Sequence, residues 1–227
     1  MRSLDSVTFD ASGLTPQGDQ DGVRVWHTPA GDGIGLYYHP IPPDIEADLE
    51  SVSAVRAFYR EIAMQFGVAV IELDLTQANG CLVIRQIIKE PQQPHGMTYR
   101  GSFTLPFRDF SYVIKIQCME HETTGVREAV VLDEKLAAGE VKLDEKNGTI
   151  SGWMQDPYDS SIRDVFARNK SEAMEYDQRF PEHPLSRLRR AMRRVQQTLR
   201  ISEEVQREPR FKYAPREKPK TPWWKVW

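Results

Sequence analysis

Residues 110–119 read Phe-Ser-Tyr-Val-Ile-Lys-Ile-Gln-Cys-Met, and this stretch decides the fold. Its large apolar side chains recur at every second position, which is the period at which a β-strand presents side chains to one face. Tyr112, Ile114 and Ile116 therefore share one face with Cys118, whereas Lys115 and Gln117 share the other. The pattern predicts a sheet that is covered better on one side than on the other.

Three more apolar runs precede this strand, at residues 68–75, 81–89 and 97–105. The connections between them are short, and the tightest is Ala78-Asn79-Gly80. Short connections favour antiparallel neighbours, because parallel strands need a crossover of about a dozen residues or more. The four runs therefore predict an antiparallel meander.

Other elements are predicted on both sides of the meander. A β-hairpin is expected over residues 22–39, where turn residues at 29–33 separate two alternating stretches. A helix is expected after Ser51 or Ser53, with Gly67 at its end, and a second one between Gly125 and Gly139. The apolar stripe of the first helix is Val55, Phe58, Tyr59, Ile62 and Phe66. The stripe of the second is Val126, Ala129, Val130, Leu132, Leu136 and Ala137.

This order of elements predicts the α+β class, with an antiparallel β-sheet meander flanked by helices as an α/β sandwich, followed by a C-terminal helical extension. We divide the chain into a sheet domain at residues 1–150 and a helical extension at 151–204, which contains a basic amphipathic helix at 185–200. A tail rich in Pro, Lys and Trp follows at residues 205–227.

The middle of the chain, residues 23–139, resembles the PsbP-like fold that photosystem extrinsic proteins and Ran-binding import factors share. The resemblance rests on the strand at residues 110–116 and on the Thr124-Gly-Val-Arg-Glu-Ala129 segment that follows it. It implies a binding protein, because most members of that fold bind other molecules. It transfers no functional residue to this chain, and otherwise the sequence looks bacterial.

The charge of the chain changes sign along its length. Residues 185–227 hold 13 Lys and Arg against 4 Asp and Glu, a net charge of +9. Residues 1–184 hold 17 against 29, a net charge of −12. This asymmetry indicates a basic segment that binds its own acidic body or an acidic partner. Nucleic acid is not an expected partner, because the acidic body repels phosphate.

The basic segment begins with an apolar seam. Leu185, Leu188, Met192, Val195 and Leu199 recur at intervals of three and four, and arginines fill the positions between them. Such a helix docks on its own sheet, pairs with a partner, or forms a homodimer through residues 185–199, and the sequence leaves these alternatives open. Three of the five tryptophans stand in the last five positions, where they either anchor a partner or cover a sheet edge or apolar patch of the same molecule. The predicted partner-binding residues are Leu188, Arg189, Met192, Arg193, Trp223, Trp224 and Trp227.

No complete catalytic, cofactor or metal motif is present in the sequence. Residues 31–35 read Gly-Asp-Gly-Ile-Gly, but a strand follows where a phosphate loop needs a helix. His121-Glu122 begins like a zinc-protease helix, but Gly125 occupies the position of the second His. The ionisable residues between Glu120 and Glu128 are the one cluster that an enzyme could use.

We therefore expect a non-enzymatic binding or adaptor protein that acts through protein–protein contacts, for example a bacterial immunity protein, and that needs no cofactor. The alternative is a small hydrolase-like enzyme that uses the Glu120 to Glu128 junction. No apolar run reaches the ~18 residues of a membrane span. The two cysteines provide no disulfide framework, and they fit a reducing, cytoplasmic location.

Overall fold

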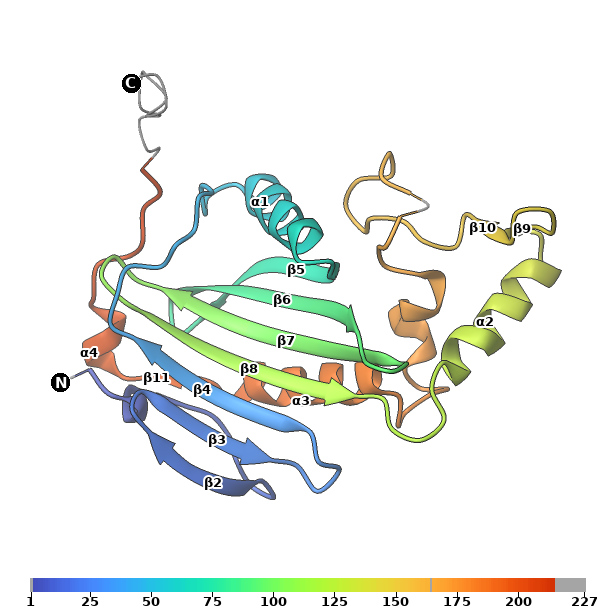
Figure 1. Ribbon diagram of the computed structural model, residues 1–227. Helices are drawn as coiled ribbons and strands as arrows, with labels where there is room; N and C mark the ends of the chain where they lie inside the picture. Colours follow the sequence, from blue (N-terminus) through green and yellow to red (C-terminus); the bar gives the residue numbers. More distant parts are fainter. Residues whose placement is uncertain (1, 164, 215–227) are drawn as a thin grey trace, which may run out of the picture.

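The computed structural model describes residues 2–163 and 165–214. Within this range, seven strands form an antiparallel sheet in the order β2-β3-β4-β8-β7-β6-β5 (Figure 1). The strands are β2 (Thr15–Gln20), β3 (Val23–His27), β4 (Gly33–His39), β5 (Ala69–Ala78), β6 (Cys81–Pro91), β7 (Met97–Pro106) and β8 (Ser111–Met119). The α+β class and the meander are confirmed, because β5 to β8 pair with one another in chain order.

The predicted hairpin is β3 and β4, and it joins the meander through the pairing of β4 with β8. β2 was not predicted from the sequence. Its six residues are all exposed and include Pro16 and Gly18, so they show none of the apolar alternation that marks a strand. β2 forms because β3 offers it a free edge, and a bulge between Pro16 and Gly18 interrupts the pairing.

Helix α1 (Val52–Gln65) lies on β5, and the side chain of Ser51 caps it by accepting the backbone N–H of Ala54 at 3.3 Å. Val55 and Ala63 are its buried residues, and they pack with Leu73 and Ile84 of the sheet. Phe66 was predicted to belong to the same stripe, but it caps the end of the helix and is 76% exposed.

Helix α2 (Val126–Ala137) begins at Gly125, whose φ of 73° lies in the left-handed region. Its position was predicted correctly but its buried face was not. Arg127 and Val131 are buried, whereas Val126 is 48% exposed. Successive residues of a helix point about 100° apart, so an error of one residue assigns the wrong buried face. The pattern of apolar residues does not reveal the buried face of α2, because the charged side chain of Arg127 lies on it. Val131 packs with Val141 and Trp153 in a small separate cluster.

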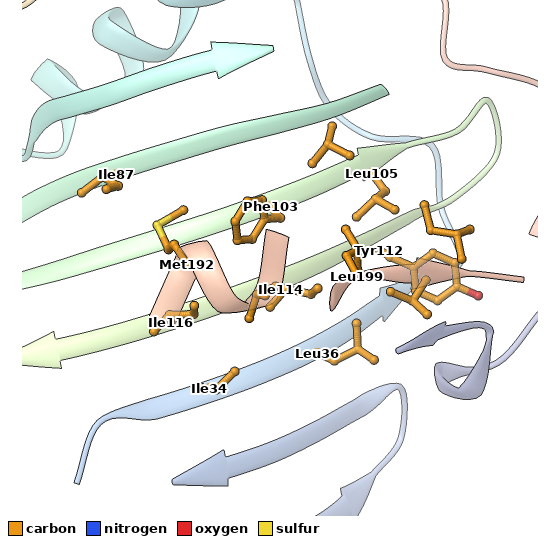
Figure 2. Packing of buried hydrophobic residues seen from close by; sticks show 14 of the residues in the cluster. Ile34, Leu36, Ile87, Phe103, Leu105, Tyr112, Ile114, Ile116, Met192 and Leu199 are labelled. Atoms are coloured by element: carbon orange, nitrogen blue, oxygen red, sulfur yellow. The ribbon is translucent and has the colours of Figure 1, made fainter. Parts of the chain in front are cut away.

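Helix α3 (Pro184–Thr198) packs across β7 and β8, on the face of the sheet opposite to α1. All five seam residues are at most 3% exposed. Figure 2 shows Met192 beside Phe103 and Ile116 of this face. The seam therefore docks on the chain's own sheet, which is one of the alternatives that the sequence left open. A homodimer through residues 185–199 stays a prediction, and it would have to use the exposed outer side of α3 because the seam is covered by its own sheet.

The remaining elements tie the two ends of the described chain together. β1 (Val7–Thr8) pairs with β11 (Arg200–Ile201) directly after α3, and α4 (Glu203–Gln206) follows. Val7, Ile201 and Val205 join the core cluster beneath α3. The other short elements are η1 (Leu4–Ser6), the β9 (Lys142–Asp144) and β10 (Thr149–Ser151) hairpin, η2 (Lys170–Glu172) and η3 (Met174–Tyr176). None of the helices in residues 2–163 and 165–214 combines the length and apolar character of a membrane crossing.

Gly101 of β7 provides a direct test of this docking. A Cβ atom at this position would lie 3.0 Å from Leu188 Cδ1 and closer still to Met192 Sδ. We expect Gly101→Val to lower the free energy of unfolding by about 1–3 kcal/mol through overpacking, and to speed tryptic cleavage within α3.

Gly33→Val in β4 is the matched control, because a Cβ atom there would lie 4.0 Å from its nearest neighbour, the ring of His27. Urea denaturation and limited trypsin digestion measure both variants. A Gly101→Val protein as stable and as protease-resistant as Gly33→Val would contradict the docking of α3 on β7.

Candidate functional site

The structure divides the predicted partner-binding residues into three groups. Leu188 and Met192 are fully buried under the sheet, and Arg189 is 3% exposed. This placement corrects the prediction for these three, because they are interior residues of the chain's own fold. Arg193 is exposed on the outer side of α3. The remaining three, Trp223, Trp224 and Trp227, lie outside the described residues.

Arg189 points into a buried network of charges at one end of the sheet. Its guanidinium donates to Glu72 Oε1 at 2.7 Å and to Asp177 Oδ1 at 2.8 Å, and also to the carbonyl oxygen of Glu172 at 2.7 Å. Glu72 accepts a second guanidinium, that of Arg85, at 2.7 Å. Arg189 of α3 thus points into the protein interior. Its hydrogen bonds link α3 to β5 and to the loop that precedes α3.

Arg127 of α2 enters the same network from the other side. Its Nε atom donates to the carbonyl oxygen of Ser171 at 2.7 Å, and its terminal nitrogens reach Asp177, Ser186 and Ala173 at 2.9–3.1 Å. Burial lowers the pKa of this guanidinium below its ordinary value, and the charge of Asp177 opposes that effect. Arg127 and Arg189 share Asp177, so α2, α3 and the loop between them are fixed together.

A second part of the network is a buried ion pair with a tyrosine. Lys89 Nζ lies 2.9 Å from Glu172 Oε2, and the two side chains are 1% and 0% exposed. Tyr99 donates its hydroxyl to the other oxygen of Glu172 at 2.9 Å. Burial, followed by the charges of Glu172 and Glu128, raises the pKa of Tyr99 well above its ordinary value. The phenol therefore stays protonated and acts as a hydrogen-bond donor.

Within the Glu120 to Glu128 junction, Glu120 points inward, whereas His121 and Glu122 point to solvent. Glu120 is buried, and its two carboxylate oxygens accept the backbone N–H groups of Gly125 and Met97 at 2.9 and 2.8 Å. His121 and Glu122 are exposed. A hollow of about 310 Å³ lies beside the junction and is lined in part by Glu120, His121 and Arg127. The carboxylate and the guanidinium that border it are both engaged by backbone or buried partners.

His183 lies at this junction although the sequence did not connect it with residues 120–128. It stands just before α3, and its Nε2 atom lies 3.5 Å from Glu128 Oε1 and 4.0 Å from Glu120 Oε1. Ligand atoms of these three residues fall within 4.8 Å of one another, which is the geometry of a potential metal site among the described residues. No spacing pattern in the sequence joins residues 120, 128 and 183, so only the fold brings them together.

The hydrogen bond on the other side of the His183 ring decides against a metal at this point. Nδ1 accepts the backbone N–H of Leu185 at 3.2 Å, so it carries no proton, and the neutral ring must carry its proton on Nε2. A metal-binding His normally donates its second ring N–H to an acceptor, and here that position is an acceptor itself. We therefore interpret the cluster as an N–H group that faces two carboxylates. Burial tends to raise the pKa of Glu128, but the interactions with His183, together with a backbone hydrogen bond and the charge of Arg127, outweigh burial and lower the pKa.

Breaking the Lys89–Glu172 pair tests the energetics of the network. We expect Lys89→Met to lower the free energy of unfolding by about 3–5 kcal/mol, because it leaves the Glu172 carboxylate buried without a cation. Arg108→Met is the control, since Arg108 is 64% exposed and pairs with its neighbour Asp109. Urea denaturation should show little change for the control. A loss under about 1 kcal/mol for Lys89→Met would mean that the pair contributes no more than a surface pair.

Glu72 gives the network a defined dependence on pH. Burial tends to raise its pKa, but the charges and hydrogen bonds of Arg189 and Arg85 outweigh burial, so the pKa lies below the ordinary value of 4.5. A carboxylate with a lowered pKa stabilises the folded state above that ordinary value, and this contribution is lost as the pH falls through the lowered pKa. We expect Glu72→Gln to be destabilising at neutral pH and the difference from the wild type to shrink below about pH 4.5. Urea melts across this pH range measure both proteins, and a difference that grows on acidification would contradict the assignment.

The second candidate site is on the opposite face of the sheet. Among the helices of the described chain, α1 covers this face only over β5 and its neighbour, and Figure 1 shows the remaining strands without a helix in front of them. A groove with a volume of about 520 Å³ lies there. We call it the open-face groove, and it is lined by Val25, Gly33, Ile34, Gly35, Tyr37, Gln86, Ile88, Arg100, Gly101, Ser102, Lys115, Ile116 and Gln117.

Polar side chains form the floor of the open-face groove, and the register of β7 and β8 determines which of them are neighbours. Ser102 faces Lys115 across β7 and β8, and Arg100 faces Gln117 in the same way. Arg100 donates its Nε–H to Gln117 Oε1 at 3.0 Å. The ring of Tyr37 packs closely against Gly35, where a Cβ atom would come within 2.7 Å of Tyr37 Cε2. Lys115 Nζ is 4.9 Å from the centroid of this ring.

The comparisons with known proteins bear on the fold alone. No protein family model and no curated protein matches the chain. The chain is similar to the solution structure of cyanobacterial PsbP (CyanoP) from Synechocystis sp. PCC 6803, with a TM-score of 0.36 and 14% identity over 60% of this chain and 86% of that chain. It is also similar to a crystal structure from Bacteroides thetaiotaomicron VPI-5482, with a TM-score of 0.33 and 5% identity over 54% of this chain and 41% of that chain. The PsbP-like resemblance expected from the sequence thus recurs among the structural matches.

Proposed function

We propose that this protein is a non-enzymatic binding or adaptor protein that contacts a protein partner through the open-face groove. One observation carries the proposal: part of the sheet is covered by a helix on one face and uncovered on the other, and the uncovered face forms a groove there. Exposed Arg100 and Lys115 line this groove together with half-buried amide, hydroxyl and phenol groups. Convergent polar groups on a concave, partly apolar surface are the usual features of a binding site.

The state of the other candidate site supports binding over catalysis. The carboxylate of Glu120 and the guanidinium of Arg127 form hydrogen bonds with backbone and side-chain groups, and these bonds stabilise the local fold. A catalytic acid or base needs a lone pair or a proton that a substrate can reach. Glu128 Oε2 and His183 Nε2 have no hydrogen-bond partner among the described residues, but both atoms are buried, so the hydrolase-like alternative at the Glu120 to Glu128 junction is less well supported.

The location and the form of the partnership remain parts of the same proposal. Cys81 and Cys118 are both buried free thiols, which fits a reducing, cytoplasmic location. An immunity protein, which binds and neutralises one partner, is a concrete version of this function. The three terminal tryptophans stay in the proposal as additional contact residues. Arg193 lies on the outer side of α3 and stays a separate prediction that binding in the open-face groove does not use.

Site-specific photocrosslinking tests the proposal. A photoreactive phenylalanine derivative replaces Ser102 in the open-face groove or, as the matched control, exposed Gln196 on the outer side of α3. Each full-length protein is irradiated in a lysate of the source organism. We expect the position 102 variant to crosslink to one protein, excess unlabelled wild-type protein to compete with it, and the position 196 variant to give no such product.

Crosslinking of the same protein from position 196 alone would place the partner on α3 and contradict the use of the open-face groove. The absence of a competed product from both positions would contradict the binding function.

A further inference from the structure

The open-face groove has an unusual charge for this molecule. Residues 1–184 carry a net charge of −12, yet the described residues that line the groove include Arg100 and Lys115 and neither Asp nor Glu. A cationic hollow in an acidic body attracts an anionic group locally, while the body repels an extended polyanion. The charge therefore indicates which chemistry the groove accepts.

The two cations are placed to share one ligand. Lys115 and Arg100 are diagonal neighbours on β8 and β7, since Lys115 faces Ser102 and Arg100 faces Gln117. Diagonal neighbours of this kind are about 7–8 Å apart at the backbone, within reach of long side chains. A single carboxylate placed between them accepts hydrogen bonds from both, and it adds to the ion pair that Arg100 already forms with Glu90.

The two cations also differ in the interactions that they already make within the protein. Lys115 contacts the ring of Tyr37 and forms no ion pair with any described residue. Arg100 is oriented by Gln117 and pairs with Glu90 through Nη2 at 2.5 Å, although its side chain is 46% exposed. Among the described residues Lys115 therefore has no acidic partner, whereas Arg100 is held in position by Gln117 and Glu90. Ser102 and Gln86 stand next to them and add neutral hydrogen-bonding groups.

We propose that the open-face groove binds an acidic segment of the partner protein, with an Asp or Glu carboxylate held between Lys115 and Arg100. This inference rests on the proposed function and names the chemistry of the partner. The Tyr37 ring over Gly35 supplies the apolar surface on which the aliphatic part of the acidic side chain packs. Because both cations are exposed, the contact is sensitive to salt.

Defined peptides test the inference with the full-length protein. The probe is a fluorescein-labelled peptide with blocked ends that alternates Glu and Val, and the reference is the same peptide with Gln in place of Glu. In fluorescence anisotropy we expect the Glu peptide to bind at least about tenfold more tightly than the Gln peptide. Raising the ionic strength from about 50 to about 300 mM should weaken this binding severalfold.

Charge reversal identifies the site. We expect Lys115→Glu and Arg100→Glu each to reduce binding of the Glu peptide by at least about tenfold. Lys142→Glu is the matched control, because Lys142 is an exposed lysine of β9 that lies outside the groove lining, and it should bind like the wild type. Circular dichroism confirms that each variant is folded.

Three results would overturn the inference: no binding of the Glu peptide, equal binding of the Glu and Gln peptides, or an equal loss of binding in Lys142→Glu. Tighter binding of single-stranded oligothymidine with the same dependence on Lys115 would also overturn it, because it would identify a phosphate ligand. If the inference fails in any of these ways while crosslinking from position 102 still captures one competed protein, the binding function stands and only the acidic nature of the partner is wrong.

Discussion

The docking of α3 across β7 and β8 is the contact on which the rest of the structure depends. Burying a side chain of the size of Leu or Met stabilises the fold by about 1.5–3 kcal/mol, and all five seam residues are buried. The same contact brings the ends of the described chain together, because β11 follows α3 and pairs with β1. It also fixes the direction in which Arg189 points, and through Arg189 the positions of α2 and the segment around Asp177.

The apolar seam and the buried charges have different roles in this arrangement. Replacing a buried ion pair by apolar residues is often neutral or stabilising, so such pairs contribute more to the choice of geometry than to net stability. Here Arg189 and Arg127 each bind acceptors from more than one segment, and Lys89 of β6 binds Glu172 of η2. We infer that the seam supplies most of the free energy, and that the ionic network selects one orientation of α3 and α2. Because α3 closes this face, the part of the other face that α1 leaves uncovered is where we propose that a partner binds.

Much of the fold could be predicted from the sequence because its strands alternate cleanly. The period of two in residues 110–119 identified both the buried face and the polar face with Lys115 and Gln117. The sequence could not assign the partner of the 185–199 seam, since periodicity reveals an apolar face without revealing what covers it. It placed the buried face of α2 one residue away, because Arg127 is charged and is buried by long-range hydrogen bonds. His183 and Glu172 were missed for the same reason: their partners lie far away in the chain.

Native-state hydrogen exchange tests the central claim, that α3 and the sheet form one cooperative unit, most directly. Amides of α3 and of β8 should then exchange with the same free energy of opening, and that energy should fall with the same slope as denaturant is added, because both are exposed only by global unfolding. Exchange of the α3 amides through a separate opening, at lower free energy and with a smaller denaturant slope than those of β8, would contradict the account. It would mean that the helix is an appended element that leaves the sheet while the sheet stays folded.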